Sequence, residues 1–161
     1  MEIIGLIGKS NSGKTSSLKY LILNLLDLDE IKILYSSRLF SESPKQLKEN
    51  ILNNWKTETG HIKDITVLLE YKGKKIGITT YGDSLNDILS ALNTIIKRFD
   101  GCDIFVCSRH ENNSLEEEFY DYNIDKFYSI PKERSSSDEN YNGENISTGS
   151  ELIDCILSEI N

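Results

Sequence analysis

Several residue types are scarce in this chain, and their scarcity excludes whole classes of protein. The 161 residues include three cysteines, two histidines and two prolines, and no Cys-x-x-Cys pair occurs. A disulfide framework needs more paired cysteines, and a structural zinc site needs clustered cysteine and histidine ligands. Ten glycines and two prolines are too few for a fibrous protein or a proline-rich linker. We therefore expect free thiols, no structural metal and a cytoplasmic protein.

Long hydrophobic stretches are missing as well. No apolar run approaches the roughly 20 residues that cross a bilayer, and the residues after Met1 lack the pattern of a signal peptide. We expect no contact with membranes. Because 38% of the residues are hydrophobic, the chain can bury a core of its own. We expect residues 1–161 to form a single domain.

Positive charge is in short supply. The chain has 18 lysines and arginines against 26 acidic residues, and its formal net charge is −8. Such a surface repels phosphate backbones, so non-specific binding to nucleic acids is not expected. The acidic run Glu116–Glu118 suits either a protein partner or an ordinary solvated helix face. Any site for an anion must therefore be local.

Short apolar runs alternate with amphipathic segments along most of the chain. The predicted strands are 2–7, 31–35, 65–71, 74–81, 103–107 and 126–130. The predicted helices are 14–28, 44–55, 85–99, 111–122 and 151–161. The polar stretch 131–150 is predicted to be a mobile loop, and Lys72-Gly73 the turn of a hairpin. This order predicts a three-layer αβα fold with a mainly parallel sheet and one antiparallel hairpin.

The most specific motif is the segment Gly8–Thr15, with the sequence Gly-Lys-Ser-Asn-Ser-Gly-Lys-Thr, which matches G-x-x-x-x-G-K-[ST] at every required position. Gly8 and Gly13 permit a tight backbone path whose N–H groups converge on phosphate oxygens. The following helix adds unpaired amides and the positive end of its dipole. Lys14 is suited to neutralise phosphate charge, and the Thr15 hydroxyl to bind Mg²⁺.

With a strand before it and a helix after it, this motif resembles the Walker A motif of the P-loop NTPase superfamily. The resemblance implies a P-loop fold that binds Mg²⁺ together with ATP or GTP as substrate. The residues implied in nucleotide binding are Gly8, Lys9, Ser10, Asn11, Ser12, Gly13, Lys14, Thr15 and Ser16.

A P-loop enzyme also needs an acidic group near its metal ion. Asp83 follows the predicted strand 74–81 and is our candidate for a second metal partner beside Thr15. The alternative is that Asp83 only caps the next helix.

Three of the four arginines, Arg38, Arg109 and Arg134, follow predicted strands and could form an anion-binding rim. Of these, Arg109 is our candidate to stabilise transferring charge. The expected catalytic residues are Lys14, Asp83 and Arg109.

Two narrower resemblances point in different directions. The loop resembles that of translation-factor-type GTPases, but Asp83-Ser84-Leu85-Asn86 lacks the glycine of their Asp-x-x-Gly switch, and no Asn-Lys-x-Asp motif occurs. Lys9 stands where the partition and septum-site ATPases carry a signature lysine, but Ser10-Asn11 replaces their glycine pair. ATP is therefore the preferred nucleotide.

Three functions are compatible with these residues. The first is Mg²⁺-dependent hydrolysis of ATP. The second is a small-molecule or nucleotide kinase, in which 44–55 forms an acceptor flap carrying Trp55 and 131–150 forms a lid. The third is a slow NTP-dependent switch that acts on a protein partner.

Overall fold

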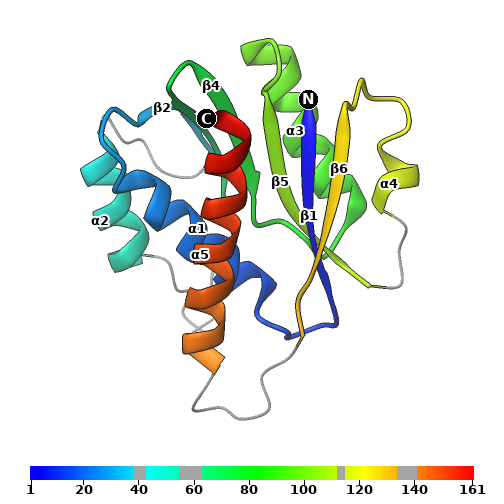
Figure 1. Cartoon of the computed structure of the whole chain (residues 1–161), viewed down its shortest axis with the longest axis horizontal. Coiled ribbons are helices and arrows are strands. Elements are labelled where there is room, and N and C mark those ends of the chain that lie inside the picture. Colours follow the sequence, from blue (N-terminus) through cyan, green and yellow to red (C-terminus); the bar gives the residue numbers. More distant parts are fainter. Residues whose placement is uncertain (38–42, 55–62, 112–114, 134–140) are drawn as a thin grey trace.

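A computed structural model describes the chain apart from residues 38–42, 55–62, 112–114 and 134–140 (Figure 1). The strands are β1 Glu2–Gly8, β2 Lys32–Ser36, β3 Thr66–Tyr71, β4 Lys74–Thr79, β5 Ile104–His110 and β6 Lys126–Pro131. The helices are α1 Lys14–Leu26, α2 Pro44–Asn54, α3 Leu85–Phe99, α4 Leu115–Glu118 and α5 Tyr141–Ile160.

The strands form one mixed sheet in the order β2-β3-β4-β5-β1-β6. Strand β3 is antiparallel to both of its neighbours, whereas β4, β5, β1 and β6 pair in parallel. The turn between β3 and β4 has positive φ at Lys72 (49°) and Gly73 (77°), as tight hairpin turns require. The predicted α/β class and the predicted hairpin are confirmed.

Helices cover both faces of the sheet (Figure 1). Because side chains alternate along a strand, Ile4 and Leu6 of β1 join the core beneath α1 and α5. Ile3 joins a second core beneath α3, together with Phe105 of β5. The connection from β1 to α1 lies at the carboxyl edge of the sheet, opposite both chain ends (Figure 1).

The C-terminal helix begins ten residues earlier than expected, so the prediction of a loop over 131–150 is wrong for residues 141–150. Their glycine, serine and asparagine content disfavours a helix, but packing overrides this preference. Gly149 is buried where α5 crosses α1, and a Cβ there would lie 2.8 Å from Tyr20 Cβ. The Thr148 hydroxyl donates to Glu144 O at 2.9 Å, which satisfies it within the helix.

Two other boundaries differ from the sequence pattern. Strand β5 runs to His110 rather than ending at Cys107, because it continues to pair with β1 as far as Gly8. The helix predicted over 111–122 is limited to α4 in the described residues. The chain turns after α4 and buries Phe119 fully. The ring centroids of Phe119 and Phe105 are 6.4 Å apart.

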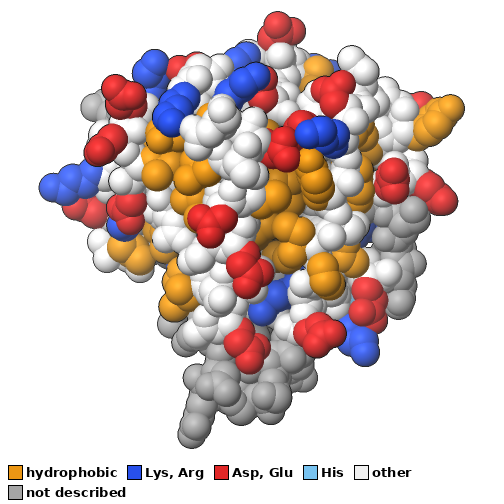
Figure 2. Space-filling view, viewed as in Figure 1, with side chains coloured by type: hydrophobic (Ala, Val, Ile, Leu, Met, Phe, Trp, Pro, Cys, Tyr) orange, Lys and Arg blue, Asp and Glu red, His pale blue; other side chains and the backbone are white. Residues whose placement is uncertain are grey.

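The surface carries mixed charge. On the face with α5, acidic and basic side chains are interspersed rather than gathered into patches of one sign (Figure 2). No helix in the described part of the chain has the length and apolar character needed to cross a membrane.

Candidate functional site

The segment between β1 and α1 forms a tight loop at the carboxyl edge of the sheet. Asn11 and Gly13 both adopt positive φ, 58° and 90°, and the Ser12 N–H donates to Lys9 O at 3.3 Å. Ser12 is almost fully buried, with 1% of its surface exposed. The loop is therefore a compact turn whose path depends on residues with left-handed backbone.

Both motif glycines lie where the backbone meets other elements closely. A Cβ on Gly8 would lie 2.2 Å from the carbonyl oxygen of Lys132, which follows β6. A Cβ on Gly13 would lie 2.1 Å from Asn145 Oδ1 of α5. Larger residues at either position would displace the C-terminal part of the chain from the loop.

The amino end of α1 is left open. Its N-cap, Gly13, makes no side-chain capping hydrogen bond, and no acidic residue occupies the first turn. Helix α3 differs, since the Ser84 hydroxyl accepts from the Asp87 N–H at 3.4 Å. The first amides of α1 thus keep the hydrogen-bonding capacity and the positive dipole end that favour an anion.

Lys14 folds its side chain back over the loop. Its ammonium donates to the carbonyl oxygens of Gly8 at 2.9 Å and Lys9 at 2.6 Å. Burial lowers the pKa of Lys14, while the negative charges of Asp83 and Glu111 raise it in part. Since both carboxylates act on this ammonium, the structure brings Asp83 and Lys14 into one electrostatic environment.

Asp83 lies in the turn between β4 and α3 with its side chain exposed. The preceding Gly82 packs on β5, where a Cβ would lie 2.3 Å from Ser108 Oγ. Ser84, and not Asp83, is the N-cap of α3. The Asp83 carboxylate is therefore not used for capping. Strand β4 is also not adjacent to β1, because β5 lies between them.

Arg109 lies within β5, in register with Ile7 of β1, rather than in a loop after the strand. It is only 7% exposed, and its buried Nη1 has no hydrogen-bond partner in the described structure. Burial raises the pKa of Cys107 to about 12, and the charge of Arg109 lowers it in part. Cys107 belongs to the core beneath α3. The guanidinium of Arg109 therefore lies on the face of the sheet that α3 covers. Lys14 begins α1, which covers the opposite face.

Two residues that the sequence analysis did not single out contact the loop. The Glu111 N–H donates to Gly8 O at 3.3 Å, and its carboxylate lies 4.0 Å from Lys9 Nζ. Asn145 is fully buried, and its Oδ1 lies 3.5 Å from the Ser17 hydroxyl. Its Nδ2 has no hydrogen-bond partner among the described residues. The position of Glu111 directly after β5 could have indicated a residue near the loop. Nothing in the polar sequence around Asn145 indicated that Asn145 is buried beside the loop.

The described residues offer no cluster of side chains that could hold a metal ion by themselves, since no group of three or more histidine, cysteine or acidic side chains comes together among them. Mg²⁺ usually keeps several waters and substrate oxygens and takes only one or two protein ligands. Thr15 begins α1 and Asp83 follows β4, and a Mg²⁺ ion held by these two residues stays a prediction.

Arg38, Trp55 and Arg134 lie outside the described residues, so the structure does not place the proposed arginine rim beyond Arg109. No protein-family model matches this chain, and no curated protein or solved structure shows significant similarity to it.

Proposed function

We propose that this protein binds a magnesium–nucleoside triphosphate, with ATP as the preferred nucleotide, and hydrolyses it within a P-loop NTPase fold. The proposal is carried by one observation: the Lys14 ammonium lies in the Gly8–Thr15 loop beside the uncapped amino end of α1. Amides and an ammonium in this arrangement form a site for a compact polyanion.

The phosphates of the nucleotide would take the place of the loop carbonyls as partners of Lys14. The backbone amides from Gly8 to Ser16 would bind phosphate oxygens, and Thr15 and Asp83 would hold Mg²⁺. When bound, the metal ion offsets charge that develops on the phosphate oxygens.

In the proposed reaction, water attacks the γ-phosphorus, the bond to the β–γ bridging oxygen breaks, and the nucleoside diphosphate leaves. Glu111 is an exposed carboxylate next to the loop and is suited to accept the proton of the attacking water. The buried Nη1 of Arg109 has no hydrogen-bond partner among the described residues. Its guanidinium lies on the α3 side of the sheet, away from Lys14, so we assign Arg109 no contact with the transferring group.

The decisive experiment is a titration of ATP and Mg²⁺ into Lys14→Ala, measured by calorimetry. Loss of the charged hydrogen bonds should weaken binding about 10- to 100-fold. Lys97→Ala is the matched control, because this exposed lysine lies in the last turn of α3, away from the loop. Unchanged affinity in a folded Lys14→Ala protein would remove the basis of the proposal.

A further inference from the structure

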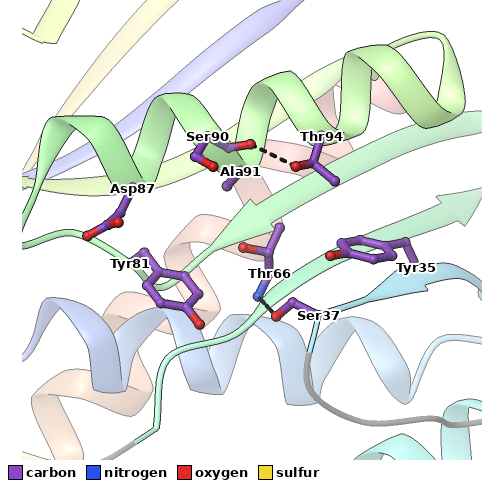
Figure 3. Close-up of a pocket in the computed structure, with 8 residues that line it drawn as sticks. All are labelled: Tyr35, Ser37, Thr66, Tyr81, Asp87, Ser90, Ala91 and Thr94. Atoms are coloured by element: carbon purple, nitrogen blue, oxygen red, sulfur yellow. Dashed lines mark hydrogen bonds between the residues drawn. The ribbon is translucent and has the colours of Figure 1, made fainter.

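A polar cavity lies at the carboxyl edge of the sheet, on the side covered by α3. Its volume is about 170 Å³. Its walls come from the end of β2, the start of β3, the residue Tyr81 after β4, and helix α3 (Figure 3). Ligands of open α/β sheets bind beyond the carboxyl ends of the strands, and this cavity occupies that edge next to the turn that carries Asp83.

The lining of the cavity is dominated by hydroxyl groups. Six of its eight described lining residues carry a hydroxyl, and the other two are Ala91 and Asp87; the full set is Tyr35, Ser37, Thr66, Tyr81, Asp87, Ser90, Ala91 and Thr94. None of these described residues is basic. Hydroxyls both donate and accept hydrogen bonds, whereas the Asp87 carboxylate only accepts. The described lining therefore suits a ligand that presents hydroxyl groups, and the Asp87 carboxylate repels an anionic ligand.

The wall formed by the strands is held in place by its own hydrogen bonds. The Thr66 N–H donates to Ser37 Oγ at 2.9 Å, as Figure 3 shows, and the Ser37 N–H donates back to Thr66 O at 2.9 Å. Thr66 Oγ1 also lies 2.9 Å from Thr79 Oγ1. Because the backbone fixes these groups, little ordering is needed when a ligand binds.

The opposite wall and the two aromatic rings complete the site. On α3, the Thr94 hydroxyl donates to Ser90 O at 2.9 Å and keeps its lone pairs for a ligand. The ring of Tyr35 is supported by Phe99 at 5.5 Å and by the Arg98 guanidinium at 5.1 Å. Tyr35 and Tyr81 lie on either side of Thr66 and Ser37 (Figure 3), so apolar ring surface accompanies the hydroxyls.

We propose that this cavity is a binding site for a small, uncharged polyhydroxylated molecule about the size of a monosaccharide. Such a molecule matches the hydroxyl-rich lining through its own hydroxyls and the tyrosine rings through its C–H groups. The volume is comparable with cavities that hold a benzene-sized ligand. The inference goes beyond nucleotide binding and does not depend on it.

The test is saturation-transfer NMR of the full chain with D-ribose, D-glucose and myo-inositol as neutral probes and D-gluconate as the anionic probe. At least one neutral probe should bind, and gluconate should bind more weakly. Ala91→Leu should abolish the signal by filling the cavity, and the near-isosteric Thr94→Val should weaken binding about tenfold. Absence of binding by all three neutral probes would overturn the proposal.

Two controls separate the possible reasons for failure. Lys97→Leu adds a leucine at an exposed position of the same helix and should leave probe binding unchanged. Lys14→Ala should also retain it, so that failure of the nucleotide proposal would not remove this signal. Binding that survives both Ala91→Leu and Thr94→Val would place the probe elsewhere and contradict the assignment.

Discussion

At the scale of single residues, the Lys14 ammonium is held by carbonyl oxygens that a polyanion would replace. Its hydrogen bonds to Gly8 O and Lys9 O satisfy the ammonium, and no carboxylate among the described residues is in direct contact with it. Burial is the main cause of its lowered pKa. A triphosphate would bring negative charge into contact with Lys14 and so stabilise its protonated form.

This difference predicts proton uptake on nucleotide binding at alkaline pH. The free protein holds Lys14 partly deprotonated there, because its pKa is lowered, and a bound phosphate raises the pKa again. Calorimetry in two buffers of different ionisation enthalpy would measure the uptake. The uptake should vanish in Lys14→Ala, and an equal uptake in that variant would assign the proton to another group.

Variants of the neighbouring residues Asp83 and Ser84 should distinguish a role in catalysis from a role in capping helix α3. Ser84→Ala removes the N-cap of α3 and should lower the free energy of unfolding by about 1 kcal/mol with little change in activity. Asp83→Asn should leave stability nearly unchanged and reduce Mg²⁺-dependent ATP turnover on the order of 10²-fold. Urea unfolding and phosphate release measure the two effects. Stability loss in the Asp83 variant, with full turnover, would return Asp83 to a structural role.

At the scale of helices and strands, the close crossing of α1 and α5 is the feature that the sequence concealed. Gly149 lies inside helix α5, where alanine would have the higher helix propensity. Its Cα lies so near α1 that a Cβ would meet Ser17 O at 3.0 Å and Leu21 N at 3.1 Å. Backbone atoms yield little, so a side chain here must push the two helices apart.

Gly149→Ala should therefore destabilise the protein, by about 1–3 kcal/mol, as overpacking does. Gly143→Ala is the matched control in the same helix, because a Cβ there meets no described atom within 4 Å. That control should stabilise the protein by about 0.5–1 kcal/mol through the higher helix propensity of alanine. Denaturant unfolding of both variants checks the opposite signs, and a stabilised Gly149→Ala would contradict the described crossing.

The elements that sequence predicted well are those whose signal is local. The Leu18–Leu26 repeat of α1, the apolar run of β1 and the Lys72-Gly73 turn each specify their own structure. The loop Gly8–Thr15 could be predicted for the same reason, since its motif and its flanking elements are contiguous.

The contacts of Glu111, Asn145 and Arg109 could not be predicted in that way. The extension of β5 that brings Glu111 beside Gly8 depends on pairing with β1, about a hundred residues earlier in the chain. The burial of Asn145 depends on α5 docking against α1. The pleat of the extended strand sends Arg109 to the α3 side, which the expectation of a loop residue did not anticipate.

At the scale of the whole molecule, the candidate site joins elements from both ends of the chain. The loop contacts β6 and α5 as well as its own helix. A ligand that binds only the native arrangement stabilises it by mass action. ATP with Mg²⁺ at 100 times its Kd should therefore raise the free energy of unfolding by about 2.7 kcal/mol.

Urea unfolding with and without the nucleotide checks this prediction, and Lys14→Ala should lose most of the increment. Parallel measurement of phosphate release distinguishes the chemistries. Release without any acceptor supports hydrolysis, whereas diphosphate formed only with an added acceptor would replace hydrolysis with phosphoryl transfer. An increment of equal size in Lys14→Ala would show that the nucleotide binds elsewhere.

The contact between the loop Gly8–Thr15 and α5 also determines when this loop can reach its final structure during synthesis. Ser17 and Asn145 are 128 residues apart in sequence but lie within one buried contact. A ribosome-bound chain that has released only the loop and α1 lacks the backbone of Lys132 and the side chain of Asn145 that enclose Gly8 and Gly13. The loop Gly8–Thr15, although encoded near the start, is enclosed only after Lys132 and Asn145 have emerged.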